Sequence, residues 1–349
     1  MGTQPLVIGL MSVESISLIQ ANIKNEEGLK LHKYHIFHLL ITLGYDKIKL
    51  FDSLWDMGKV EFKMRVLMIG AHQDDNEFRS GGLAHKLVKK GHVVRFLSCC
   101  NGSGGHHIMT PEETVKRRAG ESAAVAELLG LKYDVWDEED CNLVADLATR
   151  KKMIRYIREF NPDLIIAHRP NDYHADHRAA GQLVLDASYL LTVPHECPDA
   201  PAMRFMPVIL YNEDRFKNPE FRGDLVLDMD DEIDTKLQIA HLNVSQVYEW
   251  LPYNDGEIAP EGEEERLAWL KGMEITSYTT DEEVLAAKRG YAVRFARTAA
   301  RFRKELIEQY GLEKGAKIRY AEAYEVCEYG APLTEEMEKL LREGTSIPN

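Results

Sequence analysis

Long hydrophobic runs are missing from this chain of 349 residues. No segment approaches the roughly 18 continuous apolar residues that a membrane span requires, so we expect no transmembrane helix. The N-terminus has no basic segment followed by a sustained apolar stretch, which argues against a secretory signal. Basic residues are also outnumbered, because 43 Lys and Arg against 57 Asp and Glu give a formal net charge of −14. This balance disfavours binding to nucleic acid or to an anionic membrane.

Cysteine is scarce as well. The five cysteines are odd in number and contain no CxxC pair: Cys99, Cys100, Cys141, Cys197 and Cys327. Such usage favours a reducing, cytoplasmic location over a disulfide framework. The adjacent Cys99 and Cys100 fall on a predicted strand, so they point to opposite faces and cannot both bind one ion.

Three regions of the chain differ in their pattern. Residues 1–63 show no motif and no order of strand, turn and helix, so we expect an N-terminal extension, either a helical addition or the product of a start assigned upstream of Met64. We expect residues 64–330 to form the main domain and residues 331–349 to form a C-terminal tail.

The main domain alternates between apolar strands and amphipathic helices. Predicted strands at 65–69, 93–98, 132–136 and 164–167 are followed by predicted helices at 80–90, 111–129, 148–160 and 176–190. This order predicts an α/β fold with a mostly parallel sheet and helices on both faces. Beyond Pro194, we expect strands at 208–211, 225–227 and 318–326 and long helices over 231–250 and 281–310 to complete the domain.

Polar residues follow the first and fourth of these strands directly, in the segments 71–77 and 168–177, and each segment contains one motif. Each motif brings histidine and aspartate to a strand end: His72, Asp74 and Asp75 in the first, and His174, Asp176 and His177 in the second. Ligands of parallel α/β sheets bind beyond the carboxyl ends of the strands. Adjacent carboxylates are costly to bury unless a cation or a shared proton compensates them. The two motifs therefore predict the two halves of one metal site.

The spacing within the motifs suggests which residues bind the ion. His72 and Asp75 are three residues apart, as are His174 and His177, so one turn can direct each pair at a single point. Three nitrogen or oxygen ligands and an open position are typical of catalytic zinc. We predict His72, Asp75 and His177 as the ligands, which leaves Asp74 and His174 for proton transfer. Fe²⁺ or Mn²⁺ would also accept these ligands.

The remaining histidines have simpler interpretations. His85 and His92 lie in or beside a predicted helix with no acidic partner nearby, so we expect surface or packing roles. His168 is a possible ligand, but it stands two residues before Pro170 and we predict that it ends the strand.

The glycine-rich stretch 101–105 follows the second strand rather than the first and lacks GxGxxG spacing, so it is weak evidence for a dinucleotide site. His106 and His107 come directly after it. They either line the rim of the site or belong to a flexible loop.

The two motifs resemble those of the PIG-L/LmbE-type zinc deacetylase family, (A/P)HPDDxE and HxDH. Here they read Ala71-His72-Gln73-Asp74-Asp75-Asn76-Glu77 and His174-Ala175-Asp176-His177. The similarity extends from about Met64 to Val326 and includes Arg117-Arg118 on the helix between the motifs.

The resemblance implies a Rossmann-like sheet and one zinc ion held at His72, Asp75 and His177. It also implies hydrolysis of an N-acetyl group, commonly on a glucosamine-type sugar. Asp74 matches the family's general base, and His174 matches the residue that assists the tetrahedral intermediate, with Asp176 beside it.

Three positions depart from the family pattern. Gln73 replaces the proline of the first motif, the stretch 103–107 lacks an arginine that contacts sugar in some relatives, and Asn243 stands where many relatives have histidine. These changes concern the pocket rather than the predicted ligands.

We therefore predict hydrolysis of a small N-acylated sugar, in which Asp74 accepts the proton of the attacking water and His174, oriented by Asp176, stabilises the oxyanion. Two alternatives remain: an amidase for a larger sugar-thiol or other amide conjugate, and a non-catalytic carbohydrate-binding relative. A homo-oligomer is compatible with the sequence.

Overall fold

A mixed β-sheet organises the domain. The computed structural model describes residues 63–287 and 289–343, and the predictions for residues 1–62 and for a start at Met64 concern a region outside them. Within the described part, seven strands pair in the order β3-β2-β1-β4-β5-β7-β6. The strands are β1 (Arg65–Gly70), β2 (Val93–Cys100), β3 (Lys132–Glu138), β4 (Leu164–Ala167), β5 (Val208–Asn212), β6 (Leu225–Asp228) and β7 (Ala321–Val326).

The first five strands are parallel, and β7 runs antiparallel to both β5 and β6. The predicted α/β class and mostly parallel sheet are confirmed, and the C-terminal strands extend the same sheet. The strand order reverses between β1 and β4, which are neighbours in the sheet although about a hundred residues separate them in the sequence. Such a reversal opens a crevice at the carboxyl ends of the strands.

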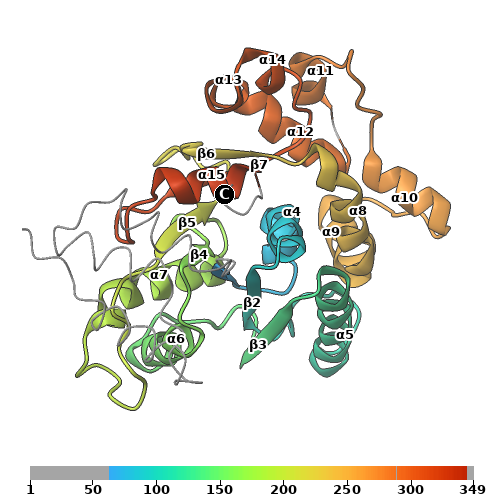
Figure 1. Ribbon diagram of the computed structural model, residues 1–349. Coiled ribbons are helices and arrows are strands. Elements are labelled where there is room, and N and C mark those ends of the chain that lie inside the picture. The colour runs from blue at the N-terminus through green and yellow to red at the C-terminus, as the bar shows by residue number, and fades with distance from the viewer. Residues whose placement is uncertain (1–62, 288, 344–349) are drawn as a thin grey trace, which may run out of the picture. The chain divides into compact units, whose positions relative to one another are not determined.

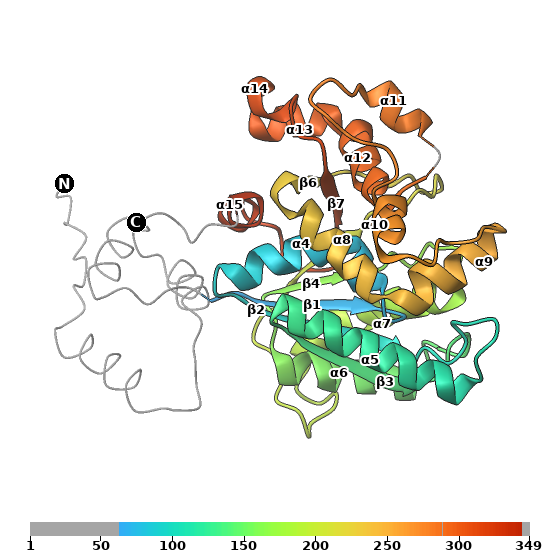
Figure 2. The same ribbon diagram turned by 90° about the vertical axis from the view of Figure 1, so that its right-hand side faces the viewer.

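Helices cover both faces of the sheet (Figure 1). The longer helices are α4 (Asp75–Lys89), α5 (Pro111–Leu129), α6 (Leu147–Phe160), α7 (Ala175–Ser188), α8 (Ile233–Leu242), α10 (Glu263–Lys271), α12 (Tyr291–Arg301), α13 (Arg303–Tyr310) and α15 (Glu335–Glu343). Helices α6 and α7 pack together on one face and share an apolar cluster with β1 and β4. Helix α4 packs against α5 and α8 on the other face, and α12 lies beside α8 and β7 (Figure 2).

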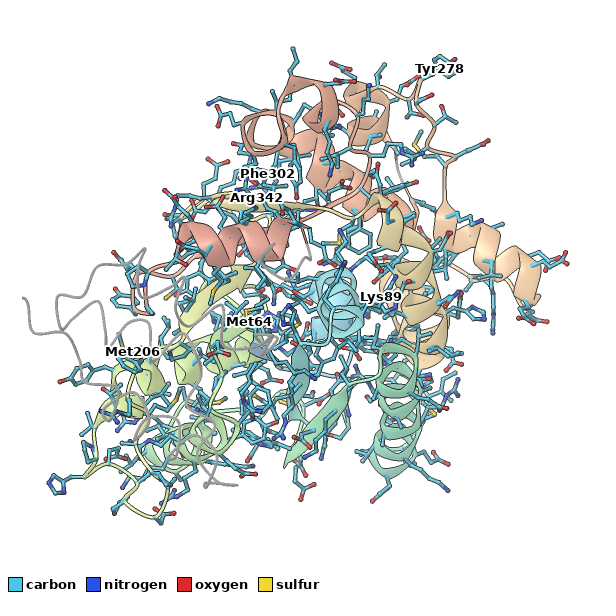
Figure 3. All side chains as sticks on the ribbon, viewed as in Figure 1. Met64, Lys89, Met206, Tyr278, Phe302 and Arg342 are labelled. Carbon is cyan, nitrogen blue, oxygen red and sulfur yellow. The ribbon has the colours of Figure 1, made fainter. Side chains whose placement is uncertain are left out.

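Two long helices predicted from the sequence are broken. The predicted helix over 231–250 divides at Asn243, which ends α8, and continues as a π-helical turn, Ser245–Trp250, before α9 (Leu251–Asp255). The predicted helix over 281–310 becomes α11 (Asp281–Ala286), α12 and α13. Gly290 interrupts it with a φ of +119°, a conformation outside any right-handed helix. Phe302, labelled in Figure 3, separates α12 from α13 and is buried against Phe221.

The predicted C-terminal tail contributes to the fold. Helix α15 packs against β6 and buries Met337, Leu340 and Leu341. Apolar side chains on one helical face explain this packing, because burying that face removes it from water.

Candidate metal centre

The turn between β1 and α4 builds the first half of the site. Asp74 caps α4 with a φ of +99°, and its backbone N–H donates to Glu77 Oε2 at 3.1 Å. The helix therefore begins at Asp75, five residues before the predicted Ser80. Asp75 Oδ2 in turn accepts from the backbone N–H groups of Ala71 and His72, at 3.1 and 2.9 Å, which fixes the carboxylate at the end of β1.

The three predicted ligands meet around the Asp75 carboxylate. His72 Nδ1 lies 3.6 Å from Asp75 Oδ2, and His177 Nε2 lies 3.4 Å from Asp75 Oδ1. The other nitrogen of each ring is held by a second carboxylate: His72 Nε2 by Asp176 at 2.9 Å and His177 Nδ1 by Asp172 at 3.0 Å. Metal-binding histidines commonly have such a carboxylate on the nitrogen away from the ion.

The charge around His72 also suits a cation. Burial opposes protonation of His72, but Asp176 and Asp75 outweigh it and raise the pKa of the ring to about 10. Without a metal, the imidazole therefore holds a proton to balance these carboxylates. A divalent ion on the same nitrogen would supply positive charge in place of that proton.

His168 also lies at the site, whereas the sequence made it a possible ligand but favoured the end of the strand. Its Nε2 lies 3.1 Å from Asp75 Oδ2, and its ring stacks on His177 with 4.2 Å between centroids. Burial lowers the pKa of His168 to about 4, so the ring is neutral at pH 7. Possible ligand atoms of Asp75, His168 and His177 lie within 4.8 Å of one another, as do those of His72, His174 and His177.

The two residues predicted for proton transfer lie nearer the opening. The side chains of Asp74 and His174 are 16% and 27% exposed, whereas those of His72, Asp75 and His177 are 11%, 9% and 6% exposed. Groups that exchange protons with a substrate need this access more than metal ligands do.

Asp74 is paired with a buried arginine that the sequence gave no clear role. Arg118 Nη2 on α5 lies 3.3 Å from Asp74 Oδ2, and the same guanidinium donates to the backbone oxygen of Gln73. Burial raises the pKa of Asp74 to about 6, and Arg118 limits that rise. A carboxylate with this pKa is ionised at neutral pH and basic enough to accept a proton.

Asp176 binds a different histidine from the one expected. Besides the contact with His72, its carboxylate accepts from the backbone N–H groups of Cys141 and Leu143 at 2.6 and 3.3 Å. His174 Nδ1 lies 3.8 Å from Asp176 Oδ2 and instead accepts from the Asp176 backbone N–H at 3.2 Å. Asp172 orients His177. The sequence offered it only as part of the segment 169–172 that leads into the second motif, with no role assigned to it.

The glycine-rich loop after β2 is held in place at several points. Asp140 accepts from the backbone N–H groups of Gly102 and Gly104. His106 Nε2 lies 2.9 Å from Glu249 Oε2, and His107 stacks on Tyr253 with 3.9 Å between centroids. These two histidines therefore fix the loop to the π-helix and α9.

The histidines predicted to lie outside the site do so. His85 Nδ1 contacts Glu232 at 2.5 Å, a partner that is distant in sequence, and His92 Nδ1 accepts from the Met64 backbone N–H at 3.1 Å. Both contacts tie neighbouring elements together.

The segment that carries both motifs is similar to a known protein family. Residues 67–188, which contain both motifs, match the PIG-L family, described as GlcNAc-PI de-N-acetylase. This part of the chain, about a third of its length, is similar to the PIG-L family. The resemblance inferred from the two motifs is therefore confirmed.

Two curated relatives of this chain have different activities. A 4-oxalmesaconate hydratase from Pseudomonas putida KT2440 is 24% identical over 196 residues, which cover 54% of this chain and 76% of the relative. A 1D-myo-inositol 2-acetamido-2-deoxy-alpha-D-glucopyranoside deacetylase from Thermobispora bispora is 26% identical over 160 residues, covering 37% of this chain and 53% of the relative.

Solved structures share the fold. The 4-carboxy-2-hydroxymuconate hydratase of P. putida KT2440 aligns with a TM-score of 0.57 and 19% identity, covering 78% of this chain and 98% of that one. The N,N'-diacetylchitobiose deacetylase of Pyrococcus horikoshii aligns with a TM-score of 0.53 and 18% identity, covering 76% and 84%. In the described residues of our chain, no helix is long and apolar enough to cross a membrane.

Proposed function

We propose that this PIG-L protein is a metal-dependent hydrolase that removes an N-acetyl group from a glucosamine-type sugar or sugar conjugate. One observation carries the proposal: His72 and His177 each have one nitrogen held by a carboxylate and the other directed at Asp75. This donor set of two imidazoles and a carboxylate fits zinc, with Fe²⁺ or Mn²⁺ as alternatives. The bound ion would polarise the acyl carbonyl and make water more acidic.

The chain's own residues would supply the proton chemistry. Asp74 would accept the proton of the attacking water, with Arg118 keeping the carboxylate ionised and oriented. His174 would stabilise the oxyanion and protonate the departing amine. Burial lowers the pKa of His174, so the ring starts neutral. It would take up one proton from solvent, balanced by the proton that Asp74 releases, and pass it to the amine.

Three alanine variants test the ligand assignment. His72→Ala, Asp75→Ala and His177→Ala should each reduce the metal content of the purified protein, measured by elemental analysis, and abolish release of free amine from N-acetylated sugars. His85→Ala is the matched control, since His85 contacts only Glu232 and should leave metal content unchanged. Full metal occupancy in any of the three would exclude that residue as a ligand. His168→Ala shows whether the ring stacked on His177 is a fourth ligand.

A hydratase is the second candidate, because the curated hydratase matches more of this chain than the curated deacetylase does. A hydratase adds water across a carbon–carbon double bond and releases no amine. Loss of ultraviolet absorbance from a conjugated unsaturated acid, without amine release from any N-acetylated sugar, would favour this activity and exclude deacetylation.

A further inference from the structure

Arginines gather beside the candidate metal centre, although the chain as a whole carries a net charge of −14. Arg79 lies on α4 one turn after Asp75, so the two share a helix face. Arg294, on α12, lines the same small cavity as Arg79 and Phe78. Arg215 follows β5 and is exposed. Two separate helices thus bring the guanidinium groups of Arg79 and Arg294 to one cavity, and the charge of Arg215 acts on Arg294.

Arg294 is half-buried on α12. Within the described residues, its guanidinium forms no hydrogen bond and no ion pair, whereas its backbone oxygen accepts from Thr298 Oγ1 at 3.3 Å. Burial and the charges of Arg79 and Arg215 lower the pKa of the guanidinium, while Tyr291 and Glu213 raise it. Arginine stays protonated in proteins. A half-buried guanidinium without a hydrogen-bonded partner can bind an anion through charge-assisted hydrogen bonds.

The nearby carboxylates already have other partners. Glu213 Oε2 accepts from Thr298 Oγ1 at 2.5 Å, and its Oε1 lies 3.4 Å from Arg301. Glu322 forms a buried ion pair with Lys236. The two acidic residues that line the cavity are therefore largely satisfied, which leaves positive charge in excess on Arg79 and Arg294.

A second group at the same place also lacks a partner. Tyr291 lies three residues before Arg294 on α12, and its ring meets Phe78 edge-on with 5.2 Å between centroids. Its hydroxyl is buried and makes no hydrogen bond within the described residues. Helix α12 therefore places two side chains whose donor groups have no hydrogen-bond acceptor among the described residues, Tyr291 and Arg294, next to the start of α4.

The cluster is also close to the candidate metal centre. Arg79 stands four residues after Asp75 on α4, one helical turn from a predicted ligand. The Arg79 side chain is held in place by donating to the backbone oxygen of Glu213 at 2.5 Å. An anion bound by these arginines would thus lie near the group that reacts.

We propose that Arg79, Arg215 and Arg294 bind an anionic group of the substrate, a carboxylate or a phosphate, beside the metal centre. Guanidinium groups bind both oxyanions through paired, charge-assisted hydrogen bonds. The inference rests on the proposed function, because it assigns the substrate class of the same site: an N-acetylated sugar that carries an acidic group. The acidic surface would otherwise repel such a substrate, so local positive charge is needed to admit it.

Kinetics with matched substrates test this proposal. We expect higher kcat/KM for N-acetylglucosamine 6-phosphate or N-acetylmuramic acid than for neutral N-acetylglucosamine. Arg294→Gln should raise KM for the favoured anionic substrate about ten- to a hundredfold, which corresponds to the loss of one charged hydrogen bond. The KM for the neutral sugar should not change. Arg294→Lys should restore part of the loss. Arg155→Gln, on an exposed residue paired with Asp199, is the matched control.

Calorimetry with inorganic phosphate and with malonate gives a measurement that does not require turnover. The metal-loaded protein should bind at least one of them, and which one binds distinguishes a phosphate from a carboxylate. Binding should be lost in Arg294→Gln and kept in Arg155→Gln. Because Arg215 is exposed, Arg215→Gln should weaken binding without disturbing the core.

The results separate the two proposals. Equal use of neutral and anionic sugars, with unchanged anion binding in Arg294→Gln and Arg215→Gln, would overturn the anion site and leave deacetylation standing. Arginine-dependent anion binding without amine release from any sugar would support the anion site and overturn deacetylation.

Discussion

Asp176 Oδ2 lies 2.9 Å from His72 Nε2, so the second motif orients a predicted ligand of the first. Asp172 does the same for His177 at 3.0 Å. The two carboxylates therefore fix which nitrogen of each ring is free to bind the ion. Their effect should be visible in metal affinity.

We expect Asp172→Asn and Asp176→Asn each to weaken metal binding about 10- to 100-fold, as is typical for residues that orient metal ligands. Competition with a chromogenic chelator measures the affinity. Asp199→Asn is the control, because Asp199 forms a surface ion pair with Arg155. Unchanged affinity in both variants would mean that His72 and His177 do not bind the ion.

Asp74→Asn should keep the metal and lose activity. An amide cannot accept the proton of water, and loss of a general base typically lowers kcat by about 10²–10⁴-fold. Since the pKa of Asp74 is raised to about 6 and the base acts when deprotonated, wild-type kcat/KM should fall as the pH drops below about 6. This acidic limb should vanish in Asp74→Asn and persist in His174→Ala. Loss of metal from Asp74→Asn would instead make Asp74 a ligand.

Glu77 should make stability depend on pH. Burial raises its pKa from 4.5 to about 8, with the Asp74 charge adding to the shift, and its Oε2 accepts from the Tyr133 hydroxyl at 3.1 Å. The folded protein thus holds a proton that the unfolded chain releases above pH 4.5, so the free energy of unfolding should decrease as pH rises from 4.5 to about 8. Urea titrations across this range should show a smaller decrease in Glu77→Gln. The same decrease in both proteins would contradict the shift.

The buried pair of Lys236 and Glu322 joins α8 to β7. Lys236→Met should lower the free energy of unfolding by about 3–5 kcal/mol, because Glu322 would remain as an uncompensated buried charge. The double variant Lys236→Met/Glu322→Gln should recover much of that loss, as measured by urea unfolding. Lys304→Met removes an exposed pair with Glu308 and should have little effect. A double variant no more stable than Lys236→Met would show that packing, not charge, dominates there.

Local sequence determined the parallel sheet and the position of the candidate metal centre. Apolar strands followed closely by His72 and by the second motif can be recognised from residues near one another in the sequence. Parallel strands then bring their carboxyl ends to one edge of the sheet. Helix α5 was predicted with its observed bounds because Thr110 caps it, Pro111 begins it and Gly130 ends it in a left-handed conformation. These signals depend only on neighbouring residues.

Tertiary structure alone decided which groups meet. Arg118 reaches Asp74 from another helix, and Arg79 and Arg294 share a cavity although more than two hundred residues separate them. Asn243 and Gly290 interrupt helices that periodicity predicted as continuous. A sequence pattern indicates the hydrophobic period and the turns of each segment. The partner of a buried charge depends instead on which elements pack together, and this packing is set by contacts between residues distant in the chain.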